Sequence, residues 1–132
     1  MPLLDQYLAF YGIADRDVEK YQRFFSRFGP SSREGCQFLF RVDGRAVAFA
    51  TVFFTHVTSI AARVAVMNDL FTEPEYRGMG IGRQLVDHCL GYAREQGAAR
   101  LQWLTGENNT RAQALYDSTG ARSSLYRVYI LD

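Results

Sequence analysis

The chain has 132 residues, of which 48% are hydrophobic and 22% are charged, and its formal net charge is +1. These values are typical of a soluble globular protein, and we expect residues 1–132 to form a single domain. A net charge this close to zero gives no electrostatic indication of nucleic acid or an anionic membrane as a partner. The sequence shows neither a secretory signal nor an apolar run of the ~18 residues that a membrane span needs, so we expect a cytoplasmic protein.

Two short amphipathic helices are predicted at the start of the chain. Apolar and aromatic residues recur at helical spacing over 3–11 and again over 17–28. Gly12 can end the first helix, and the Gly29-Pro30 pair can end the second. The aromatic residues of both segments are expected to serve mainly in packing.

Three strands are predicted next. The apolar runs 36–42 and 45–54 flank Asp43-Gly44, a pair typical of a tight β-hairpin turn. A further strand is predicted over 64–71, after a connecting turn. The chain therefore changes from helical to strand character near residue 36.

Helices and strands alternate in the second half of the chain. Helical spacing recurs over 81–93, and Gly97 is placed to end that helix. A strand is predicted over 99–105, a short helix over 109–120 and a last strand over 125–131. The whole order predicts an α/β sandwich with a mixed sheet.

The two cysteines, Cys36 and Cys89, lie in runs that are typical of a buried strand or helix. Neither belongs to a spacing typical of metal ligands, so no metal site is expected. We expect two reduced thiols in the core rather than a disulfide.

The segment EYRGMGIGRQL places Gly78, Gly80 and Gly82 between Arg77 and Arg83, after a strand and at the start of a helix. The first N–H groups of a helix lack partners within it, and the helix dipole adds positive charge there. Glycines let an anion reach those N–H groups, and arginines can contact phosphate oxygens. The segment therefore predicts a cradle for phosphate, in particular for a pyrophosphate.

Two other glycine-rich phosphate motifs do not match this segment. The P-loop needs GxxxxGK[ST], which is absent, and the dinucleotide fingerprint needs GxGxxG where this chain has GxGxG. A turn that is merely rich in glycine remains the alternative when the segment is taken alone.

The residues around the glycines resemble a known family. Arg77-Gly78-Met79-Gly80-Ile81-Gly82 resembles the acyl-CoA pyrophosphate signature, Arg/Gln-x-x-Gly-x-Gly/Ala, of the GNAT superfamily of N-acetyltransferases. Over about residues 64–121 the flanking motifs agree in order and spacing: Asn68-Asp69-Leu70-Phe71-Thr72 with Pro74 and Tyr76, Gly97-Ala98, Leu101-Gln102-Trp103-Leu104-Thr105, Asn109-x-x-Ala112-x-x-Leu115-Tyr116, and Gly120-Ala121. The runs YLAFY and WLT-x-x-N look most like a branch that acetylates small amines, amino acids or histones.

The resemblance implies a GNAT-like α/β domain with a mixed, mostly antiparallel sheet flanked by helices. Members of the superfamily usually begin with a strand before the first helix, and none is found here. The sheet is therefore expected either to lack that strand or to have its edge covered by a partner chain, since an uncovered edge is a liability. A homodimer is expected.

The resemblance also implies direct transfer of an acetyl group from acetyl-CoA to a primary amine of a small molecule, of amino-acid or polyamine type, in a ternary complex. The pyrophosphate would bind the N–H groups of 78–83, and the pantetheine arm would pair with the backbone at Leu70-Phe71-Thr72. A backbone N–H there would polarise the thioester carbonyl. Asn109 is expected to cap its helix and to contact the CoA arm. The expected cofactor-binding residues are Leu70, Phe71, Thr72, Arg77, Gly78, Met79, Gly80, Ile81, Gly82, Arg83, Asn109 and Tyr116.

Tyr116 and Asp69 are the candidate catalytic residues. The family's tyrosine at the position of Tyr116 protonates the leaving thiolate, whereas from the pattern alone Tyr116 would be a core aromatic. Asp69 is a candidate base or a structural acceptor. Glu107, a water chain and Glu73 are alternatives, although for Glu73 a solvated loop charge is favoured. Asn68 stands where some small-amine relatives carry a carboxylate.

Three further side chains are expected to have no catalytic role. His56 is expected to be an ordinary loop histidine, His88 a solvated one, and Trp103 a core or interface aromatic. Two alternative functions remain: a CoA-binding module without catalysis, and a protein-lysine acetyltransferase.

Overall fold

The computed structural model describes residues 18–28 and 32–132, so the helix predicted over 3–11 lies outside the described residues. The elements in chain order are α2 Val18–Phe25, β1 Gly35–Val42, β2 Arg45–Val57, the 3-10 turn η1 Thr58–Ile60, β3 Ala62–Thr72, the 3-10 turn η2 Pro74–Tyr76, α3 Ile81–Glu95, β4 Leu101–Gln102 and α4 Thr110–Ser118. Within this part of the chain, no helix is both long and apolar enough to cross a bilayer.

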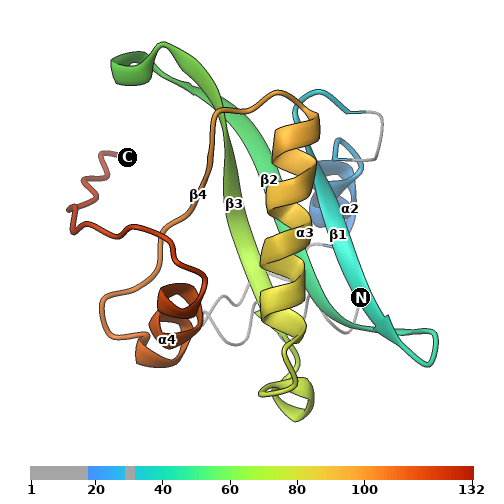
Figure 1. Cartoon of the computed structure of the whole chain (residues 1–132). Helices are drawn as coiled ribbons and strands as arrows, with labels where there is room; N and C mark the ends of the chain where they lie inside the picture. The colour runs from blue at the N-terminus through green and yellow to red at the C-terminus, as the bar shows by residue number, and fades with distance from the viewer. Residues whose placement is uncertain (1–17, 29–31) are drawn as a thin grey trace.

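The sheet has the order β1-β2-β3-β4 (Figure 1). The pairs β1–β2 and β2–β3 are antiparallel, and β3–β4 is parallel. At the first hairpin, Asp43 and Gly44 have φ values of 51° and 79°. Positive φ values at both residues of a two-residue loop are typical of a type I′ turn, whose twist matches that of the flanking strands. The hairpin prediction is therefore confirmed.

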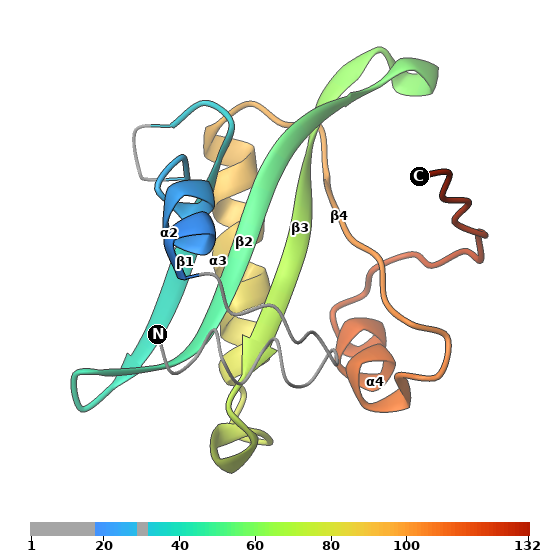
Figure 2. The ribbon, with the colours of Figure 1, turned by 180° about the vertical axis from the view of Figure 1, so that it is seen from behind.

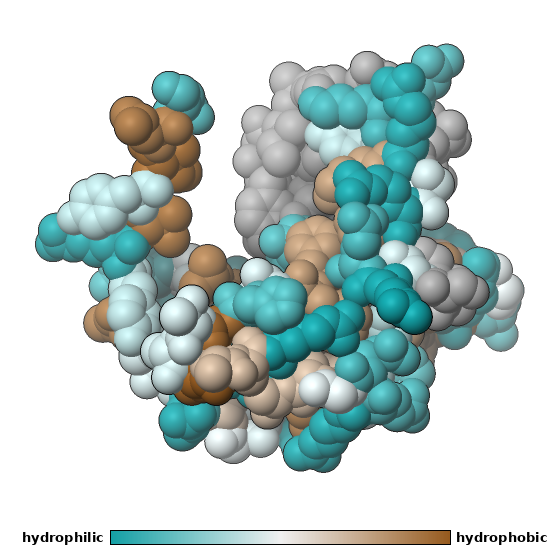
Figure 3. Space-filling model, turned by 90° about the horizontal axis from the view of Figure 1, so that it is seen from above, coloured by the Kyte–Doolittle hydropathy of each residue, from teal (hydrophilic) through white to brown (hydrophobic). Residues whose placement is uncertain are grey.

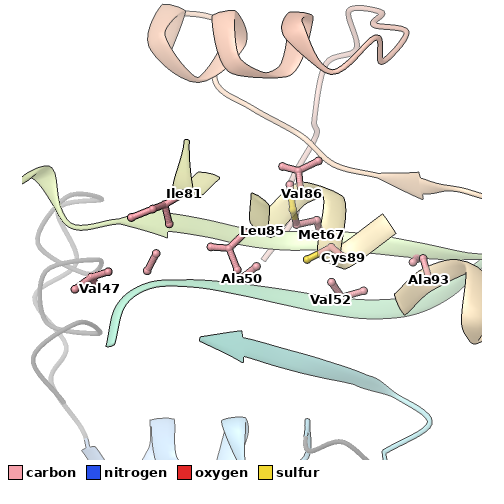
Figure 4. Close-up of a cluster of buried hydrophobic side chains, with 11 residues drawn as sticks. Val47, Ala50, Val52, Met67, Ile81, Leu85, Val86, Cys89 and Ala93 are labelled. Atoms are coloured by element: carbon pink, nitrogen blue, oxygen red, sulfur yellow. The ribbon is translucent and has the colours of Figure 1, made fainter. Parts of the chain in front are cut away.

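Helix α3 covers one face of the sheet (Figures 1 and 4). Its buried residues, Ile81, Leu85, Val86, Cys89 and Ala93, follow the helical repeat and pack against residues of β2 and β3. Alanines at 48, 50 and 65 let the helix approach the sheet closely. The buried cluster comprises Val47, Ala48, Ala50, Val52, Ala65, Met67, Ile81, Leu85, Val86, Cys89 and Ala93.

Helix α2 lies on the opposite face of the sheet from α3 (Figure 2). The ring of Phe28, just after α2, lies 5.1 Å from the Phe24 ring and 5.0 Å from the Phe53 ring on β2, between centroids. Aromatic pairs at this separation add stabilisation beyond the area that they bury. This cluster anchors α2 to the sheet.

The strand predicted over 125–131 is absent, and residues 121–132 form neither helix nor strand. Six large apolar residues in this segment are 68–100% exposed: Leu125, Tyr126, Val128, Tyr129, Ile130 and Leu131. Figure 3 shows a largely hydrophobic arm that stands apart from the rest of the molecule. An alternating pattern becomes a strand only beside a neighbour that supplies ladder hydrogen bonds. The strand predicted over 99–105 is observed only as the two-residue strand β4, so it offers few ladder hydrogen bonds to a neighbouring strand.

Candidate functional site

The glycine turn leads from β3 through η2 into α3. Gly78 and Gly80 have φ values of 78° and 82°, and Gly80 is the N-cap of α3. A Cβ at either position would meet no described atom within 4 Å. These two glycines are therefore required by backbone conformation and not by packing within the described chain.

The N-terminus of α3 points its first N–H groups out of this turn. Gly80 has no side chain, and no side-chain hydrogen bond among the described residues caps the helix. The first N–H groups of an uncapped 15-residue helix form a site suited to an anion. That this site takes the pyrophosphate of CoA stays a prediction from the sequence.

Gly82 has a different role from the other two glycines. A Cβ on Gly82 would lie 3.0 Å from Cδ2 of Leu115 on α4. Its missing side chain therefore lets α4 pack against the first turn of α3. Figures 1 and 2 both show α4 beside the lower end of β3, next to the glycine turn.

The two arginines that flank the turn are held by backbone carbonyls. Nε of Arg77 donates to the Thr72 carbonyl at 2.9 Å, and its guanidinium lies 5.5 Å from the centroid of the Phe71 ring. Burial, and then the nearby guanidinium of Arg111, lower the pKa of Arg77. Nη1 of Arg83 donates to the Ser118 carbonyl at 3.1 Å, which ties α3 to the C-terminal end of α4.

A β-bulge decides where Asp69 lies. Thr51 pairs with Asp69, but the next residue of β2, Val52, pairs with Met67, which leaves Asn68 as the extra residue. Directly opposed residues of an antiparallel pair share a face. Because Val52 packs against α3, its neighbour Thr51 and the facing Asp69 lie on the opposite face of the sheet.

Asp69 is only 8% exposed, and Thr51 beside it is fully buried. Nε2 of Gln37 on β1 reaches Oγ1 of Thr51 at 3.4 Å. Nδ2 of Asn68 donates a long hydrogen bond, of 3.5 Å, to Oδ1 of Asp69. A row of polar side chains thus crosses three strands and ends at the Asp69 carboxylate.

Glu73 corrects a sequence-based expectation. The sequence favours a solvated loop charge, but Glu73 is 2% exposed and its two carboxylate oxygens lie 2.8 and 2.7 Å from Nη2 of Arg45. Its N–H also donates to the Val47 carbonyl at 2.8 Å. The chain folds back over the start of β2 directly after β3, and this places the carboxylate beside Arg45. Glu73 therefore fixes the end of β3.

Helix α4 begins at the predicted cap. Oδ1 of Asn109 accepts from the Ala112 N–H at 3.3 Å, and the cap prediction is confirmed. Tyr116 is half-buried, and its ring meets the Trp103 ring edge-on with 5.2 Å between centroids. Trp103 packs against the core as predicted. The ring of Tyr116 is therefore held in place by packing.

Three other side chains that were considered from the sequence are exposed. Glu107 and His88 are exposed, while His56 is exposed on β2 and not in a loop as predicted. A hollow of about 180 Å³ between β1 and α3 is lined by Leu39, Phe40, Gln84, Leu85 and His88, none of them a predicted site residue. In the described ranges no three His, Cys, Asp or Glu side chains gather as a metal site would need.

Sequence reasoning missed two arginines near the site. Arg45 is identified only by its pairing with Glu73, and no local pattern places these two residues together. Arg111 lies in the first turn of α4, close enough to Arg77 to affect its titration. Arg111 is four residues before Leu115 and so shares its helix face. This spacing places Arg111 near the glycine turn only once the contact between Leu115 and Gly82 is known.

The fold is that of an α/β protein with a mixed sheet. Its bulged strand β3 leads through the glycine turn into the uncapped helix α3, and this arrangement suits a phosphate-bearing ligand. Residues 3–121 match the model of the Acetyltransferase (GNAT) family. This match covers most of the chain, so the protein belongs to the GNAT family, and its class is that of an acyltransferase.

Individual relatives agree with this membership. An uncharacterised N-acetyltransferase of Methanocaldococcus jannaschii is 28% identical over 125 residues, which are 89% of this chain and 55% of the relative. A D-amino-acid N-acetyltransferase of Saccharomyces cerevisiae is 38% identical over 74 residues, which are 55% of this chain and 45% of the relative. The chain thus matches about half the length of each of these relatives.

Solved structures share the fold. The crystal structure of a probable acetyltransferase superposes with a TM-score of 0.82 at 26% identity, over 99% of this chain and 87% of the other. An aminoglycoside N-acetyltransferase in complex with CoA superposes with a TM-score of 0.74 at 18% identity, over 87% of each chain.

Proposed function

We propose that this protein transfers the acetyl group of acetyl-CoA to the primary amine of a small molecule of amino-acid or polyamine type, with residues 1–132 acting as one domain. The observation that carries the proposal is the uncapped N-terminus of α3, presented by Gly78 and Gly80 directly after β3. The name of the yeast relative, which acts on D-amino acids, supports the acceptor class. The CoA complex of the structural neighbour supports the donor.

The donor would be held by the backbone of the turn and of the last residues of β3. The N–H groups of residues 78–83 would bind the pyrophosphate, with Arg77 beside them. The backbone at Leu70, Phe71 and Thr72 would pair with the amides of the pantetheine arm, as an added strand does. Asn109, at the cap of α4, would contact the same arm.

The reaction would be a direct transfer. The nitrogen lone pair of the acceptor attacks the thioester carbonyl carbon, a backbone N–H at the end of β3 stabilises the oxyanion, and the C–S bond then breaks. The Tyr116 hydroxyl gives its proton to the leaving thiolate, and Asp69 takes the proton that the amine loses, directly or through water. The product is an N-acetyl amide with free CoA.

Tyr116→Phe tests the role of the hydroxyl. The variant keeps the ring that packs on Trp103, so we expect the unfolding temperature and the affinity for CoA to stay close to those of the wild type. Loss of a general acid lowers kcat by about 100-fold or more. Steady-state kinetics with acetyl-CoA and the best acceptor give both values, and a kcat equal to the wild-type value would remove Tyr116 from the mechanism.

The test of the overall reaction is the release of CoA thiol, followed with a thiol reagent. Acetyl-CoA is supplied with a panel of amino acids of both hands, polyamines and a lysine-containing peptide. Release that depends on a small amine supports the proposal. Release with the peptide alone would indicate a protein acetyltransferase, and binding of CoA without any release would indicate a binding module.

We also propose a homodimer that works in the cytoplasm. The outer edge of β1 has no neighbouring strand within the described sheet, and the apolar arm at 125–131 is exposed. Uncovered edges and apolar segments favour association. Free thiols at Cys36 and Cys89 fit a reducing compartment. Analytical ultracentrifugation tests the dimer, and a monomer at micromolar concentration would contradict it.

A further inference from the structure

One face of α4 lies along the start of α3. Leu115 approaches Gly82, and the carbonyl of Ser118 accepts from Arg83. Ser118, near the C-terminal end of α4, thus contacts Arg83, and Leu115, closer to the N-terminus of α4, contacts Gly82. Residues four apart in a helix share a face, so the next residue on that face is Arg111. It lies on the side of α4 that approaches the glycine turn.

The charges at this place support the same arrangement. Arg111 lies near enough to Arg77 to lower its pKa, after burial, which is the larger cause. Arg111 is exposed, and in the described part of the chain no hydrogen bond or ion pair holds its guanidinium. Arg111 also lies in the first turn of α4, where the helix dipole is positive. The guanidiniums of Arg77 and Arg111 thus lie close enough to interact, beside the N-terminus of α3.

We propose that Arg111 is a second cationic ligand for the pyrophosphate of CoA, facing Arg77 across the glycine turn. The assignment rests on the proposed function, because it presupposes that CoA binds at this turn. A diphosphate carries charge that offsets the repulsion between the two arginines. A guanidinium can donate two parallel hydrogen bonds to phosphate oxygens. Arg111 would therefore be a binding residue, and free to move until the ligand arrives.

The experiment compares Arg111→Gln with Arg94→Gln by isothermal titration calorimetry. Arg94 lies in the last turn of α3, about 20 Å along the helix from the glycine turn, and its variant removes the same charge. Each protein is titrated with CoA, with dephospho-CoA, which keeps the pyrophosphate, and with pantetheine, which has no phosphate. Arg111→Lys is included because it keeps the charge but loses the paired donors.

We expect Arg111→Gln to raise the Kd for CoA and for dephospho-CoA by about tenfold each. The Kd for pantetheine should not change, and Arg111→Lys should fall between the wild type and Arg111→Gln. Because the variant removes a like charge from beside Arg77, the unfolding temperature without ligand should stay the same or rise. A merely structural role would lower it. Arg94→Gln should bind like the wild type.

Several results would overturn this assignment. One is a Kd of Arg111→Gln for CoA within twofold of the wild-type value. Another is a loss of affinity for CoA but not for dephospho-CoA, which would place Arg111 at the 3′-phosphate. A third is a change in the KM of the amine alone. The wild-type titration separates the two proposals. If the wild type does not bind CoA, the proposed function fails as well. If it does and Arg111→Gln binds equally well, only the role of Arg111 fails.

Discussion

Gly82 shows how one missing side chain sets the position of a helix. Its Cβ position lies 3.0 Å from Cδ2 of Leu115, so a branched side chain there would have to displace Leu115 or the whole of α4. Gly78 and Gly80 meet no such neighbour among the described residues. The three glycines thus serve two purposes, the backbone of the turn and the packing of α4.

We predict that Gly82→Val lowers the free energy of unfolding by about 1–3 kcal/mol, the usual cost of overpacking. Leu115→Ala in the same chain should recover part of this loss, because it removes the atom that valine would strike. Urea unfolding of the two single variants and the double variant measures this coupling. Strictly additive changes would show that Gly82 and Leu115 do not meet.

The buried thiols give the stability of the protein a defined dependence on pH. Burial raises the pKa of Cys89 from 9.0 to about 12, and it also raises the pKa values of Cys36 and Tyr92. Above about pH 9 the unfolded chain releases the Cys89 proton while the folded protein keeps it. The free energy of unfolding then falls by up to about 1.4 kcal/mol per pH unit as the pH rises toward 12.

Urea unfolding across this pH range, on the wild type and on Cys89→Ala, checks the prediction. The variant begins less stable because alanine leaves a small cavity. It should nevertheless lose less stability than the wild type between about pH 9 and 12, because one titrating group has been removed. Parallel curves for the two proteins would mean that Cys89 does not titrate as its burial requires.

At the scale of elements, the ion pair between Arg45 and Glu73 joins the start of β2 to the end of β3. The Glu73 side chain is 3% exposed, whereas that of Arg45 is 56% exposed. The pair between Arg27 and Glu34 has the same distance of 2.7 Å, but its side chains are 58% and 55% exposed. The two pairs differ chiefly in burial, so they form a matched comparison.

We predict that Glu73→Gln costs about 1–3 kcal/mol of unfolding free energy, because it leaves a buried amide against a guanidinium. Glu34→Gln should cost less than about 1 kcal/mol, as is usual for exposed ion pairs. Urea unfolding provides both values. Equal costs would show that burial of the Glu73 carboxylate adds nothing to the pair.

Local patterns predicted the elements whose causes are local. Asp43-Gly44 fixes its hairpin through two positive φ values, the apolar period of α3 places its buried face, and Asn109 caps α4. The segment 125–131 has an equally regular pattern, but a strand also depends on a partner, and β4 ends after two residues. The periodicity of apolar residues indicates which side chains favour burial, but it does not indicate whether a partner strand lies beside them.

At the scale of the whole molecule, the candidate site joins segments that are distant in the sequence. The glycine turn could be identified from its own residues, because its chemistry lies in consecutive backbone groups. The burial of Glu73 and the placement of Arg111 depend on contacts with Arg45, 28 residues away, and with α3. Such contacts cannot be inferred from the spacing of residues along the chain. For this reason the burial of Glu73 was predicted wrongly and the position of Arg111 was not predicted.

We propose that the glycine turn binds the pyrophosphate of acetyl-CoA. The most direct measurement is a thermal-shift titration of the wild type, Gly80→Glu and Gly91→Glu with acetyl-CoA, ATP and NAD. Gly91 lies on the exposed side of α3 with open space around it, so it receives the same side chain away from the turn. Because Gly80 has a positive φ, each ligand shift is measured from that variant's own melting temperature, with Gly80→Asn as a less strained second variant.

We predict that acetyl-CoA raises the melting temperature of the wild type and of Gly91→Glu with increasing concentration, as a ligand of the native state must. ATP and NAD should give smaller shifts, and Gly80→Glu should show none with acetyl-CoA. A wild type that acetyl-CoA does not stabilise, or a Gly80→Glu variant that it stabilises equally, would contradict the assignment of this turn as the pyrophosphate site.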